Sequence, residues 1–279
     1  MINSIDKRKG YNTLFTIMIC IFCAIATLPL FFIFSFIIQN GLEGINLDFI
    51  LHAASDFEIN GGGIANAIVG SVCIVLLAAV ISLPIGVLIG TYIAEYPKQK
   101  LAKLTSFSVE VLHGVPSIVI GIFTWICVVR PLGGFSATSG SIALGIMILP
   151  IIIRSTEETL KLLPKNLKEA SLALGAPYWK TILFVVLPAG LSGIVSGGIL
   201  SIARISGETA PLLFTALGSR YLHFDMSKEM ETLPTLIYNY ARDPSPLMHT
   251  KAWGAALILL IGILGLNILA RSLASKWKW

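Results

Sequence analysis

Residues 65–94 read ANAIVGSVCIVLLAAVISLPIGVLIGTYIA, a stretch without a single charged side chain. Because an α-helix rises about 1.5 Å per residue, about 20 apolar residues are enough to cross the ~30 Å hydrocarbon core of a bilayer. Pro84 does not argue against a helix, since neighbouring helices can satisfy the backbone groups that a proline frees inside a membrane. The stretch therefore predicts a transmembrane helix.

The composition of the whole chain points the same way. The 279 residues have a mean hydropathy of +0.84, and only 13% of them are charged. A soluble domain carries about a quarter charged residues, so an ordinary soluble fold is excluded. The net charge of +5 could suggest nucleic-acid binding, but the basic residues lie in short segments between apolar runs. That pattern is typical of membrane loops, and we expect no nucleic-acid role.

Further apolar runs predict six transmembrane helices in a single domain over residues 1–279. The first run follows Lys7, Arg8 and Lys9 and contains Ala24-Ile-Ala26, so it imitates a signal peptide. It continues for 25 residues with no polar region before the imitation cleavage site, and we expect an uncleaved span. The fourth run is apolar only over 141–153 and reaches spanning length if 135–140 is included. The predicted spans are 14–38, 65–94, 107–129, 135–153, 182–205 and 252–273.

The distribution of lysine and arginine sets the orientation. The N-terminus, the segments 95–106 and 154–180, and the C-terminus together hold fourteen of these residues, whereas the alternate segments hold five. Basic residues accumulate on the cytoplasmic side of membrane proteins. Six spans with both termini in the cytoplasm satisfy this asymmetry.

A short helix is predicted over 164–175, inside the basic segment between the fourth and fifth spans. Pro164 suits the first helical position, Gly175 suits the residue after the helix, and Pro177 follows as a stop. Leu167, Ala170 and Leu174 would share one face. On the residues alone, such a helix could dock into a groove of a partner or lie on lipid headgroups.

Residues 169–188, EASLALGAPYWKTILFVVLP, resemble the EAA loop of ABC importer permeases, with Ser171 in place of the usual alanine. The resemblance implies that the 164–175 helix is a coupling helix that docks on a cytoplasmic ATPase, with Glu169, Ala170, Ser171 and Gly175 at the interface. The chain itself lacks an ATP site, because Trp179 stands where a P-loop needs glycine before Lys180. We therefore expect no catalytic residue and no cofactor here, with ATP and Mg bound by the partner.

Metal and redox chemistry are also not expected. The four histidines are scattered, and the four cysteines all lie inside apolar runs. Cys20 and Cys23 have the spacing of redox and metal sites, but no second pair accompanies them. We interpret them as small residues of a membrane helix.

Arg204 and Glu208 are the charged pair of the fifth span. An arginine near the middle of a span costs about 2.5–3.5 kcal/mol on insertion scales, so it usually faces a partner or a watery cavity. Residues four apart share a helix face, so Glu208 could neutralise Arg204. Two readings stay open: a structural ion pair, or a contact in which the guanidinium fork binds an oxyanion.

The stretches ARISGETAPLLFTA (203–216) and HGVPSIVIG (113–121) resemble the PstA-type permease subunits of bacterial phosphate ABC importers. The resemblance implies an all-α membrane protein with the ABC type I importer permease fold, in the bacterial inner membrane. It places Arg204 and Glu208 on the substrate pathway. The implied partners are a PstC-type second permease subunit, a PstB-type ATPase dimer and a PstS-type phosphate-binding protein.

The expected function is therefore that of a non-catalytic permease subunit of an ATP-driven phosphate importer. One alternative is an ABC permease for another oxyanion, such as sulfate or molybdate. Another is an ATP-independent secondary transporter, which would leave a coupling helix without purpose. A membrane enzyme fits least, because no nucleophile–base or metal constellation is present.

Overall fold

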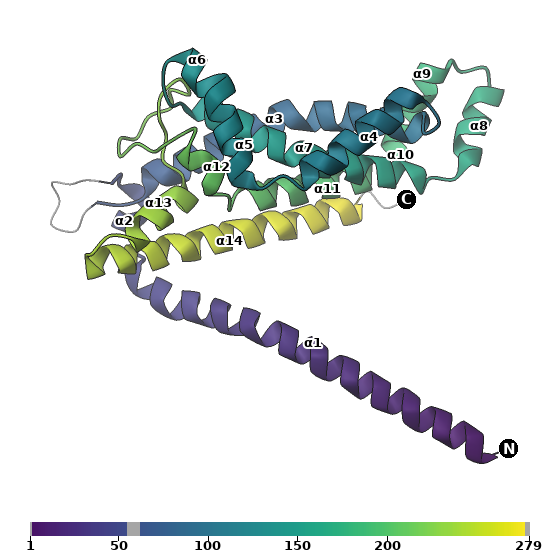
Figure 1. Ribbon diagram of the computed structural model, residues 1–279, viewed down its shortest axis with the longest axis horizontal. Coiled ribbons are helices and arrows are strands. Elements are labelled where there is room, and N and C mark those ends of the chain that lie inside the picture. Colours follow the sequence, from purple (N-terminus) through teal and green to yellow (C-terminus); the bar gives the residue numbers. More distant parts are fainter. Residues whose placement is uncertain (1, 55–61, 277–279) are drawn as a thin grey trace.

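The computed structural model describes residues 2–54 and 62–276, and these form a bundle of long helices that lie roughly side by side (Figure 1). The described residues contain no β-strand, only an isolated bridge between Ala54 and Gly62. The helices are α1 (Ile2–Gly44), α2 (Leu47–Leu51), α3 (Ala65–Glu95), α4 (Lys100–His113), α5 (Ser117–Thr124), α6 (Arg130–Leu132), α7 (Ala137–Lys161), α8 (Lys165–Ala173), α9 (Tyr178–Thr181), α10 (Leu187–Ala189), α11 (Leu191–Ile205), α12 (Ala210–Leu213), α13 (Leu233–Ala241) and α14 (Pro246–Lys276), with π-helices η1 (Trp125–Val129) and η2 (Ile182–Val186).

Four helices are each long and apolar enough to cross a membrane, namely α1, α3, α7 and α14. Two further pairs pass the same test together but are bent, by 104° between α4 and the helix that starts at α5, and by 67° between Ala189 and Leu191. The count of six spans holds if each bent pair is one span. The prediction of continuous helices over 107–129 and 182–205 was wrong, because the chain breaks at 114–116 and at Gly190.

Several helices outlast the apolar runs that predicted them. α7 extends eight residues beyond 153, to Lys161, because polar side chains do not end a helix; it stops just before Pro164. Likewise α1 and α14 continue past 14–38 and 252–273. Apolar length defines the part of a helix that lies in lipid, and the stop signals define where the helix ends.

Each π-helix ends two residues before a proline. The Arg130 N–H donates to the Trp125 carbonyl ahead of Pro131, and the Leu187 N–H donates to the Ile182 carbonyl ahead of Pro188. A proline inside a helix lacks an N–H and its ring clashes with the carbonyl four residues earlier. One wider turn relieves that clash, so each helix passes its proline without a break.

The tightest helix pair is α3 against α7. Gly86 and Gly90 present bare backbone to α7, and Ile74 and Ala78 of α3 are buried with Leu144 and Ile148 of α7. Membrane helices associate largely through close packing of such small residues, because lipid offers no hydrophobic driving force between helices. This pair forms the frame on which the other elements rest.

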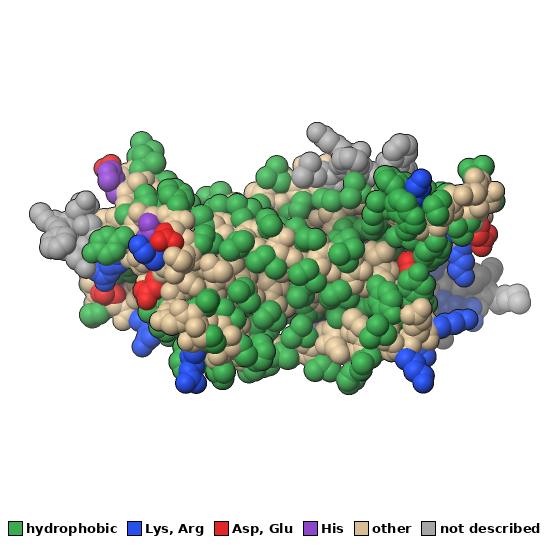
Figure 2. Space-filling view, turned by 90° about the horizontal axis from the view of Figure 1, so that it is seen from above, with side chains coloured by type: hydrophobic (Ala, Val, Ile, Leu, Met, Phe, Trp, Pro, Cys, Tyr) green, Lys and Arg blue, Asp and Glu red, His purple; other side chains and the backbone are tan. Residues whose placement is uncertain are grey.

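The outer surface has the character of a membrane protein. Figure 2 shows charged side chains gathered at the two ends of the molecule, with an apolar and neutral face between them. Helix α1 projects away from the bundle (Figure 1). The C-terminal part of α1 contacts the N-terminal part of α14, where the ring centroids of Phe36 and Trp253 lie 5.1 Å apart. Phe22 and Phe31 of α1 are exposed and have only lipid or another protein to contact.

The α3–α7 contact gives a test of the packing. A methyl group on Gly90 would lie 2.6 Å from the Ile153 carbonyl oxygen and 2.7 Å from Cβ of Thr156, whereas one on Gly262 of α14 would meet nothing within 4 Å. Overpacking typically costs about 1–3 kcal/mol, so Gly90→Ala should lower the thermal unfolding midpoint in detergent. Gly262→Ala is the matched control and should leave the midpoint unchanged or raise it. Equal midpoints for the two variants would contradict this packing.

Candidate functional site

Two interrupted helices meet inside the bundle. One is interrupted at 114–116, between α4 and α5, and the other at 206–209, between α11 and α12. A methyl group on Gly121 of α5 would lie 2.8 Å from Cα of Pro211 in α12, so the two backbones are in close contact. Broken helices at membrane depth are tolerated where they are buried in protein or line a cavity, and transporters use such breaks for binding sites.

The segment after α12 is held by the start of α7. The backbone N–H groups of Ser136, Ala137 and Thr138 donate to carbonyls of residues 215, 228 and 226, at 2.9–3.0 Å. The first N–H groups of a helix have no partner within that helix, and here carbonyls of the loop accept hydrogen bonds from them. The Ser136 hydroxyl caps the next one, from Ser139. This cap fixes α12 and the following loop to the α3–α7 frame.

Arg204 lies in the last turn of α11 and points away from the helix core. Its neighbours Ala203 and Ile205 are 5% and 1% exposed, whereas Arg204 itself is exposed. The half-buried Glu208 lies beyond the end of the helix, because α11 stops at Ile205 and Ser206 caps it. The expected helical pairing is therefore wrong: within the described chain the two side chains form no direct ion pair, although their charges still interact.

The predicted coupling helix is present as α8. Pro164 caps it rather than occupying its first turn, one residue from the expected position. Gly175 has a φ of +82°, its N–H donates to the Leu172 carbonyl, and the Ala176 N–H donates to the Ser171 carbonyl. This pair of bonds is the Schellman motif, which favours glycine after the helix. The prediction that Gly175 is the residue that ends the helix is confirmed.

The apolar face of α8 has no partner in the described part of the chain. Leu167, Ala170 and Leu174 are exposed, Leu174 by 89%, and Glu169 is exposed as well. Ser171 faces the other way, and its hydroxyl lies 2.9 Å from that of Thr181. Of the predicted interface residues, Glu169 and Ala170 are thus available to a partner, whereas Ser171 holds α8 to α9.

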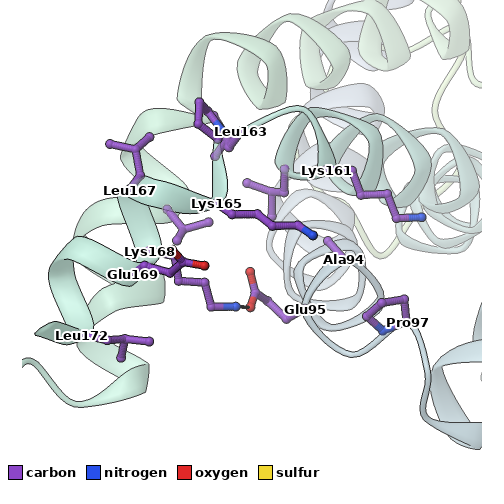
Figure 3. A pocket seen from close by; sticks show the side chains of 13 residues that line it. Ala94, Glu95, Pro97, Lys161, Leu163, Lys165, Leu167, Lys168, Glu169 and Leu172 are labelled. Atoms are coloured by element: carbon purple, nitrogen blue, oxygen red, sulfur yellow. Dashed lines mark hydrogen bonds and ion pairs between the residues drawn. The ribbon is translucent and has the colours of Figure 1, made fainter.

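A cavity of about 490 Å³ separates α8 from the ends of α3 and α7 (Figure 3). Lys165 and Lys168 extend into it from α8, and Glu95 faces them from the last residue of α3. Glu95 accepts hydrogen bonds from the Lys168 ammonium and the Tyr178 hydroxyl. Burial alone lowers the pKa of Lys168, but the bonds to Glu95 and Tyr178 outweigh it and raise that pKa above its usual value. Lys168 therefore stays charged at neutral pH.

A second ionic cluster joins α7 to α4. The buried Glu157 accepts hydrogen bonds from Arg154 at 2.9 Å and Lys161 at 2.6 Å. Arg154 also donates to the Ser106 carbonyl of α4 at 3.0 Å and lies 3.7 Å from the Glu110 carboxylate. In the described residues, no three His, Cys, Asp or Glu side chains come together in a metal-binding arrangement.

Comparison with known proteins places this geometry in a family. Residues 86–279 match the family model described as "Binding-protein-dependent transport system inner membrane component". The chain belongs to this permease family. Its relatives include proteins called "Phosphate transport system permease protein PstA": that of Yersinia pestis is 41% identical over 86% of this chain and 82% of its own length. The one from Haemophilus influenzae is 38% identical over 95% and 94% of the two chains.

Solved structures show the permease fold. The chain is similar to a subunit of the MetNI methionine ABC transporter in an inward-facing conformation, with a TM-score of 0.66 and 19% identity over 77% of this chain and 96% of that one. A chain of an amino acid ABC transporter is also similar, with a TM-score of 0.53 and 17% identity over 76% and 92%. These likenesses confirm the all-α ABC importer permease fold expected from the sequence.

Sequence reasoning missed the partners of α8. Glu95 lies 73 residues before Lys168, and no local spacing links them. Arg154, Glu157 and Lys161 do carry a signal, since charges three and four residues apart share one helix face. The predicted fourth span ends at 153, where the apolar run ends, and so stops before these residues.

The turn after α8 gives a second test. A methyl group on Gly175 would meet nothing within 4 Å, so a substitution there acts through the backbone alone. A left-handed conformation costs a residue with a side chain about 1–2 kcal/mol, and asparagine tolerates it best. Gly175→Val should therefore loosen the segment and speed tryptic cleavage after Lys165 and Lys168, while Gly175→Asn stays close to wild type. Equal cleavage rates in all three proteins would refute the assigned turn.

Proposed function

We propose that this chain is a permease subunit of an ATP-driven phosphate importer, in which it forms half of the translocation pathway. The observation that supports this most directly is its likeness to the PstA permeases, at about 40% identity over most of both chains. A permease for another oxyanion, such as sulfate or molybdate, is the alternative to be tested.

The chain would work with partners that supply what it lacks. The exposed apolar face of α8 suits docking on a PstB-type ATPase dimer, which would bind ATP and Mg. A PstC-type permease would complete the pathway, and a PstS-type protein would deliver phosphate from outside. Permeases of this family are non-catalytic, so hydrolysis belongs to the ATPase.

The proposed location is the bacterial inner membrane, with both termini in the cytoplasm. The N-terminal end of α1, the C-terminal end of α14 and α8 all lie at the same end of the molecule (Figure 1). That end carries most of the lysines and arginines counted in the sequence. Basic residues favour the cytoplasmic side, which supports this orientation.

Arg204 and Glu208 are the residues we propose for the substrate pathway. Arg204 is exposed next to the break between α11 and α12, and the described chain gives it no direct ion-pair partner. Its guanidinium offers a planar fork of donors that matches phosphate oxygens. Glu208, half-buried just beyond α11, could accept a hydrogen bond from the P–OH of a protonated phosphate.

Reconstitution would test the function. The permease, co-purified from its native membrane with its bound subunits and placed in proteoliposomes, should take up labelled phosphate only with ATP inside and binding protein outside. An excess of about tenfold of unlabelled sulfate or molybdate should leave phosphate uptake unchanged, because a pathway selective for phosphate would bind these anions much more weakly. Uptake of sulfate or molybdate in place of phosphate would support the alternative. Phosphate uptake without any ATPase would refute coupling.

Substitution of Arg204 would test the pathway. A hydrogen bond to a charged group is worth about 1.5–3 kcal/mol, so Arg204→Gln and Arg204→Lys should each lower phosphate uptake at least about tenfold. Lysine fails because it keeps the charge but loses the planar fork. Arg130, which is exposed and stacks on Trp125, is the matched control, and Arg130→Lys should transport normally.

A charge swap separates the two readings of Arg204. The exchange Arg204→Glu with Glu208→Arg should not restore uptake, because the two residues form no ion pair and the donor moves away from its site. Full uptake by the swapped protein, at matched amounts of assembled complex, would leave only a structural role for the pair.

A further inference from the structure

The coupling helix has few anchors to the rest of the permease. Pro164 and Gly175 bound α8, and none of its residues is buried. Within the described chain, two of its side chains form hydrogen bonds to other elements: Lys168 with Glu95 and Tyr178, and Ser171 with Thr181. When a docked partner moves α8, the elements that move with it therefore depend on these contacts.

Glu95 is built as an acceptor for α8. Its side chain is only 10% exposed, and it receives both the Lys168 ammonium and the Tyr178 hydroxyl. The same ammonium lies 2.7 Å from the Tyr178 hydroxyl and 4.6 Å from the centre of that ring. Hydrogen bonds to a charged carboxylate are stronger than those between neutral groups, whereas an ion pair on an exposed surface contributes little to stability.

Lys165 offers a contrast on the same helix. It lines the same cavity and points the same way (Figure 3), but it is exposed and makes no hydrogen bond or ion pair with another described residue. The network is therefore specific to Lys168 rather than a general attraction between a basic helix and the bundle.

Glu95 is the last residue of α3, which packs closely against α7. Gly86 and Gly90 bring α3 into close contact with α7, and α7 in turn grips α4 through Arg154. The α4 helix ends at the 114–116 break beside the proposed pathway. The other route out of the coupling segment, through α9 and η2, contains a π turn and the 67° bend at Gly190. That route is irregular, whereas the route through Glu95 runs along the continuous helices α3 and α7.

We propose that Glu95, Lys168 and Tyr178 form a latch that makes α8 move with the α3–α7 pair, so that the motion of an ATPase docked on α8 reaches the helix breaks through α3. Glu95 and Lys168 are positioning residues, since they act through α8 and touch neither substrate nor nucleotide. This inference rests on the proposed function only for the source of the motion; the mechanical link itself is a property of this chain.

The link is tested first without any partner. Spin labels at Asn166 on α8 and Leu88 on α3, in a full-length chain whose four cysteines are replaced, report the distance between the two helices in lipid nanodiscs. The parent chain and Lys165→Met should give one narrow distance distribution. Glu95→Gln and Lys168→Met should each give a distribution at least twice as broad. Unchanged distributions in both variants would overturn the latch, whatever the protein transports.

The coupling consequence is tested in the assembled complex. Glu95→Gln and Lys168→Met should lower the ratio of phosphate transported to ATP hydrolysed by about tenfold, equivalent to about 1.4 kcal/mol, with normal complex assembly. The exchange Glu95→Lys with Lys168→Glu should recover part of the ratio, and Lys165→Met should not change it. A normal ratio in both single variants would refute the role in coupling, whereas a wild-type complex without ATP-dependent uptake would refute the proposed function and leave the distance result standing.

Discussion

Every backbone N–H and C=O that this chain places in the hydrocarbon must find its partner within the protein, because lipid offers none. Continuous helices meet most of this requirement by themselves, and α3 continues through Pro84, which leaves one carbonyl of its own helix without a donor. The interrupted helices cannot. They are stable because the first N–H groups of α7 are satisfied by carbonyls of residues 215–228, and because α5 and α12 are in backbone contact at Gly121 and Pro211. The breaks are therefore confined to places where the fold supplies substitutes.

The same requirement separates stiff parts of the permease from compliant ones. Small residues bring α3 and α7 into close contact, and the ionic clusters around Glu95 and Glu157 add polar links at the end of the molecule where α8 lies. Where a proline forces a π turn, as before Pro188, the helix keeps its hydrogen bonds but loses its regular geometry. A transporter needs both, since a rigid element transmits motion and a bend lets the chain absorb it.

The sequence predicted the features that depend on local chemistry. The length of each apolar run located the spans, and the glycine after 164–174 predicted a left-handed turn that the structure has. It did not predict the breaks, because Pro116 or Gly190 can be accommodated in a straight helix as readily as in a bent one, and only the neighbouring helices decide. The pairing of Arg204 with Glu208 failed for a related reason: the spacing assumed a helix that continues past Ile205. Contacts such as Lys168 with Glu95 join distant segments and left no trace in spacing.

The exposure of Arg204 limits what can surround this chain in the membrane. Exposure of a guanidinium to lipid is unfavourable, by about 2.5–3.5 kcal/mol at mid-span and less toward the end of a span, where Arg204 lies. The described chain offers Arg204 no direct ion pair to offset this cost. Leu200, one turn earlier on the same face, is also exposed. A face that combines an apolar residue with a charge suits neither bulk lipid nor bulk water, but it suits the wall of a pathway closed by a second permease subunit. The apolar side chains of the projecting α1 find few neighbours within the described chain and would be covered by lipid or by another protein. This argument supports the proposed pathway, in which a charge that is costly in lipid would contact a passing anion.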